Sequence, residues 1–135
     1  YQQYQIIKAM VKDLMLPIEI IGGEIVREKN GLAMSSRNNF LSTEERKQAN
    51  QLRKIILTCA AEIKTGQDLD ISKDKAINQL IEAGFKPDYF EVICQHNLEP
   101  ASADDTELLI AAAAWMGQPK LLDNLEMSLL SGFKR

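Results

Sequence analysis

Two parts of different pattern meet at the stretch Arg27-Glu28-Lys29-Asn30-Gly31-Leu32-Ala33-Met34-Ser35-Ser36-Arg37-Asn38. An apolar segment precedes this 27–38 loop, and a segment with helical spacing follows it. Asn30-Gly31 predicts a turn, because both residue types tolerate positive φ. Ser35, Ser36 and Arg37 then supply two hydroxyls and a guanidinium, which can donate hydrogen bonds to phosphate oxygens. The stretch therefore predicts a loop that suits a polyphosphate.

The segment before the loop predicts a helix and a short extended region. Apolar residues recur with helical spacing over residues 1–14, which predicts one buried stripe, and Pro17 ends the pattern. Residues 18–21 are short and rich in isoleucine, so they predict a strand, and residues 25–26 predict a second, brief extended piece. This order favours the last part of a nucleotide-binding α/β sheet.

The segment after the loop predicts helices followed by strands. Ser42 and Glu45 form a capping box for a helix that should run to about Thr65. Ser72 is the second predicted N-cap, for a helix that stops at Gly84. Three strands are predicted at residues 89–94, 107–115 and 120–124, although the alanines of the second also favour a helix. The expected common core contains Leu52, Ile56, Ile81, Val92 and Ile110.

The composition is that of an ordinary globular protein. The 135 residues are 45% hydrophobic and 26% charged, with a net charge of -3. Basic residues are scattered among carboxylates, so nothing predicts nucleic-acid binding, and no apolar run has the length of a membrane span. Cys59 and Cys94 lie in apolar surroundings, which predicts buried free thiols. No metal-ligand spacing is present, and the single histidine, His96, is expected to be an ordinary surface residue.

Three motifs resemble those of the pantothenate synthetase (pantoate–β-alanine ligase) family. Residues 27–38 resemble its signature, Arg-Glu-x-x-Gly-Leu-Ala-Met-Ser-Ser-Arg-Asn. Tyr1-Gln2-Gln3 resembles the end of the family motif Gly-Glu-Lys-Asp-Tyr-Gln-Gln, and residues 121–124 resemble its Ile-Asp-Asn ending. The motifs occur in the family's order and span nearly the whole chain.

The resemblance implies an α/β fold in two parts. Residues 1–40 would be the C-terminal part of a Rossmann-like ATP- and pantoate-binding domain. Residues 41–135 would form a small α+β lid domain with a short, mostly antiparallel sheet, which favours the strand at residues 107–115. The tail to Arg135 is expected to be loosely held, and Trp115 is expected to be a packing residue.

The resemblance also implies an activity. Members of the family condense pantoate with β-alanine through an enzyme-bound pantoyl adenylate, giving pantothenate, AMP and pyrophosphate. ATP is the co-substrate, Mg²⁺ assists, and its ligands are expected outside this chain. A cytoplasmic homodimer that binds neither nucleic acid nor membrane is the expected form of the intact enzyme.

Site residues can be transferred where the motifs match. Gln3 would hydrogen-bond pantoate, since an amide both donates and accepts. The backbone of Val26 would contact adenine, and the mobile loop of Met34, Ser35, Ser36 and Arg37 would hold the triphosphate. No catalytic residue and no metal ligand is expected in this chain.

The chain departs from the family in three places. The family's His-x-Gly-His motif and its Gly-Glu-Lys-Asp segment are absent, and Asn30 replaces the usual Asp. We therefore expect a fragment that is inactive by itself. Two alternatives stay open, namely a non-catalytic lid or interaction module and another adenylate-forming nucleotidyltransferase.

Overall fold

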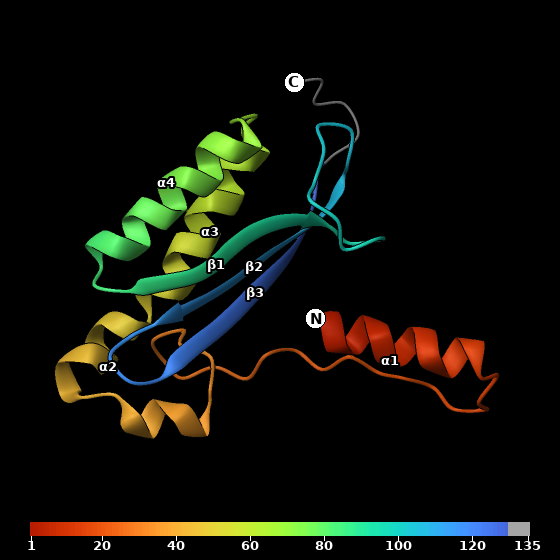
Figure 1. Cartoon of the computed structure of the whole chain (residues 1–135), viewed down its shortest axis with the longest axis horizontal. Coiled ribbons are helices and arrows are strands. Elements are labelled where there is room, and N and C mark those ends of the chain that lie inside the picture. The colour runs from red at the N-terminus through yellow and green to blue at the C-terminus, as the bar shows by residue number, and fades with distance from the viewer. Residues whose placement is uncertain (130–135) are drawn as a thin grey trace.

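The computed structural model describes residues 1–129 and shows an extended N-terminal arm followed by a helix–sheet unit (Figure 1). We use "arm" for residues 1–26 and "helix–sheet unit" for residues 41–129, which the 27–38 loop connects. None of the described helices is long and apolar enough to cross a membrane. The prediction of a loosely held tail after residue 124 is wrong for residues 125–128, which continue the third strand, and residues 130–135 lie outside the described part.

The arm contains the predicted helix, α1 (Gln2–Asp13), but not the predicted strands. The expected buried stripe is wrong, because Val11 is the one buried residue in the arm and Leu14 is 63% exposed. Residues 18–21 form no strand either, and the piece at residues 25–26 leads directly into the Arg27–Ala33 bridge. A strand requires a neighbouring strand to accept its backbone hydrogen bonds, and residues 1–129 place none beside residues 18–21.

The predicted helix after the loop is two helices, α2 (Thr43–Ala49) and α3 (Gln51–Lys64). They meet at Asn50, a residue type whose side chain competes with the helical backbone for hydrogen bonds. The capping box is confirmed, since Ser42 Oγ accepts from Glu45 N at 3.2 Å and Glu45 Oε2 accepts from Ser42 N at 2.8 Å. The helical region ends at Thr65 and Gly66, as predicted.

The next helix, α4 (Leu69–Glu82), begins earlier than predicted. Ser72 is buried inside the helix, and the N-cap is Asp68, whose Oδ1 accepts from the backbone N–H groups of residues 70 and 71. A carboxylate there satisfies two free N–H groups and meets the positive end of the helix dipole, so Asp68 outcompetes a hydroxyl one turn later. The predicted stop at Gly84 is confirmed, with φ at 88°.

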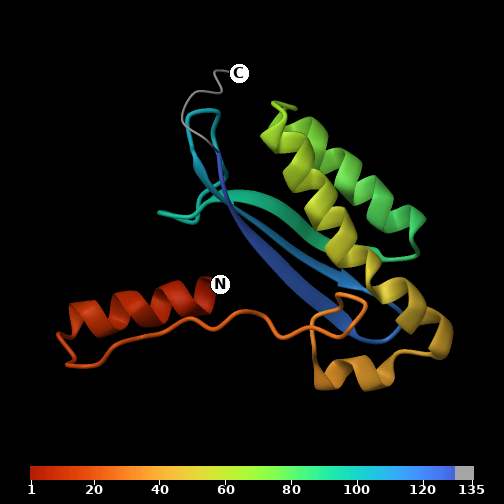
Figure 2. The ribbon, with the colours of Figure 1, turned by 180° about the vertical axis from the view of Figure 1, so that it is seen from behind.

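The described residues form one antiparallel sheet in the order β1 (Lys86–Cys94), β2 (Glu107–Trp115) and β3 (Lys120–Ser128). The strand prediction for residues 107–115 is confirmed. α3 and α4 cover one face of the sheet, and α1 lies on the other side (Figures 1 and 2). Gly117 turns the chain between β2 and β3 at φ 60°, where a Cβ would approach Glu45 Oε1 to 2.1 Å.

The core lies between the sheet and the two long helices. Four of the five expected core residues are buried, but Ile81 is 56% exposed, and its neighbour Leu80 is buried in its place. Consecutive helix residues point about 100° apart, so a one-residue error moves a side chain out of the core. Both cysteines are buried and free, as predicted. Trp115 is 38% exposed beneath Lys120 Nζ at 4.9 Å, so it does not pack in the core as expected.

Candidate functional site

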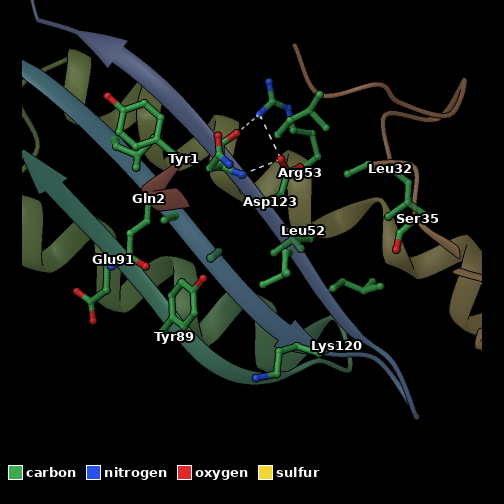
Figure 3. Close-up of a pocket in the computed structure, with 18 of the residues that line it drawn as sticks. Tyr1, Gln2, Leu32, Ser35, Leu52, Arg53, Tyr89, Glu91, Lys120 and Asp123 are labelled. Carbon is green, nitrogen blue, oxygen red and sulfur yellow. Dashed lines mark hydrogen bonds and ion pairs between the residues drawn. The ribbon is translucent and has the colours of Figure 1, made fainter. Parts of the chain in front are cut away.

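A cleft of about 610 Å³ lies between the start of α1, the 27–38 loop and the sheet (Figure 3). Four predicted site residues line it together: Gln3, Met34, Ser35 and Arg37. Val26 and Ser36 are outside the lining. The remaining polar residues of the cleft are Tyr1, Gln2, Asn38, Arg53, Tyr89, Glu91, Lys120, Asp123 and Asn124.

The 27–38 loop begins as a small hairpin. Gly31 adopts φ 92° and Asn30 Oδ1 accepts from Leu32 N at 3.1 Å, which confirms the predicted turn. Arg27 and Ala33 form an antiparallel bridge, and Leu32 is buried in the core. The hairpin therefore has one side chain fixed in the helix–sheet unit and a polar tip.

Ser35 and Arg37 follow the hairpin and face the cleft. Ser35 is the N-cap of the 3-10 helix η1 (Ser36–Phe40), and its Oγ accepts from Arg37 N at 3.2 Å. Both side chains are exposed. The Arg37 guanidinium makes no ion pair within residues 1–129, so its charge is available to an anionic ligand.

The other two predicted binding residues lie on the arm. Gln3 is exposed on α1 and lines the cleft together with Tyr1. The pKa of Tyr1 is raised, first by burial and then by the charge of Glu126. Val26 is 69% exposed, and its carbonyl accepts from Met34 N at 2.9 Å, so its backbone already closes the hairpin.

Sequence reasoning missed an ion-pair cluster around Asp123. Both oxygens of this carboxylate accept from the Arg27 guanidinium, at 2.7 and 2.8 Å, and the Arg53 guanidinium lies 4.0 Å away (Figure 3 shows Arg53 beside Asp123). This bidentate contact raises the pKa of Arg27, whereas burial and then the charge of Arg27 lower the pKa of Arg53. The sequence does contain a signal for this cluster, because Asp123 occupies an inward position of an otherwise apolar strand pattern. A buried charge needs a partner of opposite charge.

A second polar cluster holds the far end of the loop. Asn38 is 2% exposed, and its Nδ2 donates to Ala33 O at 3.0 Å and to Glu28 Oε1 at 3.2 Å. Glu28 also accepts from Arg46 Nη2 at 2.7 Å. Asn38 Oδ1 is buried without a partner among the described residues. The residues on either side of Met34–Arg37 are therefore anchored to the helix–sheet unit.

The geometry suits the binding of an anion. The cleft presents the free Arg37 guanidinium, the Ser35 hydroxyl and the Gln3 amide, and His96 is exposed outside its lining. Residues 1–129 contain no group of three or more His, Cys, Asp or Glu side chains that could hold a metal ion.

Comparison with known proteins gives a consistent match. The model of the family described as pantoate-beta-alanine ligase matches residues 1–126. The pantothenate synthetase of Shewanella sediminis is 46% identical over 93% of this chain and 44% of its own length. That of Saccharophagus degradans is 42% identical over 97% of this chain and 46% of its own length. The chain thus spans less than half the length of these curated relatives.

Solved structures agree with the sequence matches. The pantothenate synthetase of Thermus thermophilus superposes with a TM-score of 0.85 at 32% identity, over 93% of this chain and 46% of that one. The Francisella tularensis enzyme, described as a complex with beta-gamma ATP and beta-alanine, gives 0.63 at 26% identity over 93% of this chain and 40% of that one. Since the helix–sheet unit alone is too short for 93% coverage, the matches include part of the arm. The chain belongs to the pantoate–β-alanine ligase family.

Proposed function

We propose that this chain supplies the phosphate-binding loop and part of the pantoate site of a pantothenate synthetase. The whole protein would condense pantoate with β-alanine through a pantoyl adenylate, releasing AMP and pyrophosphate. The observation that carries the proposal is one cleft that Gln3, Ser35 and Arg37 line from two separate segments. The Francisella tularensis relative, whose description names an ATP compound and β-alanine, supports the same substrates.

The first step would join the pantoate carboxylate to the α-phosphorus of ATP, with pyrophosphate leaving. Arg37 and Ser35 would hold the triphosphate, together with Ser36 and the backbone of Met34, because a guanidinium and hydroxyl groups donate to phosphate oxygens. Gln3 would orient pantoate across the cleft. The backbone of Val26 would contact adenine, and the residues that act on the nucleotide would come from the rest of the enzyme.

Further features of the intact enzyme belong to the same proposal. Mg²⁺ would assist the reaction, with its protein ligands outside this chain. We also propose a cytoplasmic homodimer and a domain division near residue 40, with residues 1–40 completing a Rossmann-like domain. The exposed apolar side of α1 supports a missing partner surface for the arm.

The direct test is pantothenate formation from pantoate, β-alanine and ATP. The 135-residue chain should show no turnover alone, and activity should appear when the N-terminal half of a family member is supplied. Turnover by the chain alone near the rate of an intact enzyme would contradict the proposal, as would inactivity of the completed enzyme.

Variants of the completed enzyme assign the individual roles. Arg37→Ala should lower ATP use by about ten- to hundredfold, because charge-assisted hydrogen bonds contribute about 1.5–3 kcal/mol. Gln3→Ala should raise the Michaelis constant for pantoate more than that for ATP. Lys54→Ala is the control, because this exposed cation lies outside the cleft lining. Equal effects of Arg37→Ala and Lys54→Ala would remove Arg37 from the site.

A further inference from the structure

A buried carboxylate on β3 joins the 27–38 loop to the helix–sheet unit. The Asp123 side chain is 3% exposed, and its partner Arg27 lies 96 residues earlier in the sequence. We propose that Asp123 is a positioning residue that, through Arg27, keeps this loop in the shape that presents Ser35 and Arg37 to phosphate. The inference rests on the proposed function of the loop, but its structural half can be tested separately.

The contacts of Asp123 leave no oxygen free. Oδ2 accepts from Arg27 Nη1 at 2.7 Å, and Oδ1 accepts from Arg27 Nη2 at 2.8 Å and from Asn124 N at 2.8 Å. A bidentate guanidinium–carboxylate pair fixes orientation as well as distance. The carboxylate on β3 therefore fixes the plane of the Arg27 guanidinium.

Arg27 passes this constraint to the loop by two routes, and a neighbouring hydrogen bond extends it. Its Nη1 also donates to Gly31 O at 3.1 Å, so the same nitrogen contacts Asp123 and the hairpin turn. Its backbone pairs with Ala33 across the hairpin. The next closing bond, from Met34 N to Val26 O, ends directly before Ser35. The residues that would hold phosphate thus begin where the Arg27 hairpin ends.

Charge balance makes this carboxylate hard to replace. Arg53 lies 4.0 Å from Asp123 Oδ1 and donates to Asn124 O at 3.1 Å, so two guanidiniums share one carboxylate. Loss of the negative charge would leave Arg27 and Arg53 facing each other in a partly buried place, where like charges repel strongly. We expect the Arg27 side chain to move away from this position and the hairpin to open as a result.

The other anchor of the loop is weaker. Glu28 pairs with Arg46, whose side chain is 45% exposed, and exposed ion pairs contribute little to stability. Asn38 stays buried through its bond to Ala33 O. Because Ala33 and Glu28, the partners of Asn38, both lie in the hairpin, removal of the Asp123 charge should loosen residues 38–40 together with residues 27–37.

Hydrogen exchange of the 135-residue chain tests the structural half. In Asp123→Asn, amides of the hairpin, Glu28, Gly31 and Met34, should exchange at least about tenfold faster, with sheet amides unchanged. The matched control is Glu62→Gln, which removes a carboxylate that pairs with Lys75 between α3 and α4, outside the cleft. A double variant Arg27→Gln/Asp123→Asn should add little to Asp123→Asn, since the two residues act as one unit.

Kinetics of the completed enzyme test the functional half. Asp123→Asn should raise the Michaelis constant for ATP about tenfold and change that for pantoate less than about twofold, with partial recovery in Asp123→Glu. Unchanged hairpin exchange, or faster exchange throughout the sheet, would overturn the inference, as would equal effects on both Michaelis constants. An inactive wild-type enzyme with the expected exchange pattern would instead refute the proposed function alone.

Discussion

The arm is at least as rich in apolar residues as the helix–sheet unit, but only the helix–sheet unit has a core. Ile7 on α1 is 42% exposed, whereas Ile56 on α3 is fully buried, although both lie on the apolar side of an amphipathic helix. α3 packs against α4 and the sheet, while α1 lies on the other side of the sheet, which only the start of α1 approaches (Figures 1 and 2). Periodicity thus selects the side of a helix that can be buried, and a second surface decides whether it is buried.

The sharpest test of this comparison is one pair of matched truncations. Ile56→Ala should lower the free energy of unfolding by about 2–5 kcal/mol, because it removes buried methyl groups and leaves a cavity. Ile7→Ala in the same chain should change it by less than about 0.5 kcal/mol, as expected for an exposed site. Urea denaturation of both variants gives the two values, and equal losses would show that the arm belongs to the same cooperative core.

Deletion of the arm should have a smaller effect than the core truncation. Val11 is its one buried side chain, and Tyr1 Oη donates to Gln95 Oε1 at a long 3.4 Å. A chain that starts at Arg27 should therefore unfold cooperatively, with a loss of about 1–2 kcal/mol, roughly the burial of one valine. Thermal unfolding followed by circular dichroism measures this. Loss of the cooperative transition would show that the helix–sheet unit depends on the arm.

The smallest expected effect concerns the exclusion of water from the core around Cys59. Burial, and then the charge of Glu62, raises the pKa of the Cys59 thiol from 9.0 to about 12. The folded state holds the thiol proton more tightly, so this stabilisation is complete below pH 9 and is lost as pH rises from about 9 to about 12. By about pH 10 the loss should be about 1 kcal/mol.

The pH experiment needs a reference that lacks the thiol. Unfolding free energies of the wild-type chain and of Cys59→Ala, measured between about pH 8 and about pH 10, isolate its contribution from that of lysines and tyrosines. The difference in unfolding free energy between the wild-type chain and Cys59→Ala should become smaller, or change sign, as pH rises. Parallel curves would mean that water reaches Cys59 and that the core is more open than its burial indicates.

Local signals in the sequence predicted much of the helix–sheet unit. The capping box at Ser42 and the glycines 66 and 84 mark helix ends by contacts within a few residues, so no distant partner was needed. The wrong N-cap prediction at Ser72 also concerned a local signal, because the stronger acceptor, Asp68, lies only four residues earlier. The prediction that Ile81 is buried was wrong, because its exposure depends on the angle at which α4 meets the sheet. Periodicity over a short helix does not determine that angle.

The arm shows the opposite case. Residues 18–21 have the composition of a strand, but a strand also needs backbone hydrogen bonds to a neighbouring strand. Residues 1–129 place no strand beside them. The candidate site also combines both kinds of information. The motif of residues 34–37 predicted a phosphate-binding loop, while its place in one cleft with Gln3 follows from how the arm runs back along the sheet.

The sequence by itself determined the capping box at Ser42, the helix stops at Gly66 and Gly84, the presence of three strands, the turn at Gly31 and the motif that marks the family. Only the tertiary structure decided that Arg27 and Asp123, 96 residues apart, form a bidentate pair and that Arg53 shares it. Backbone propensities act between near neighbours along the chain, whereas a buried carboxylate is satisfied by whichever cation the packing brings to it. The sequence therefore named the residues of the loop, and the packing decided what holds the loop in place.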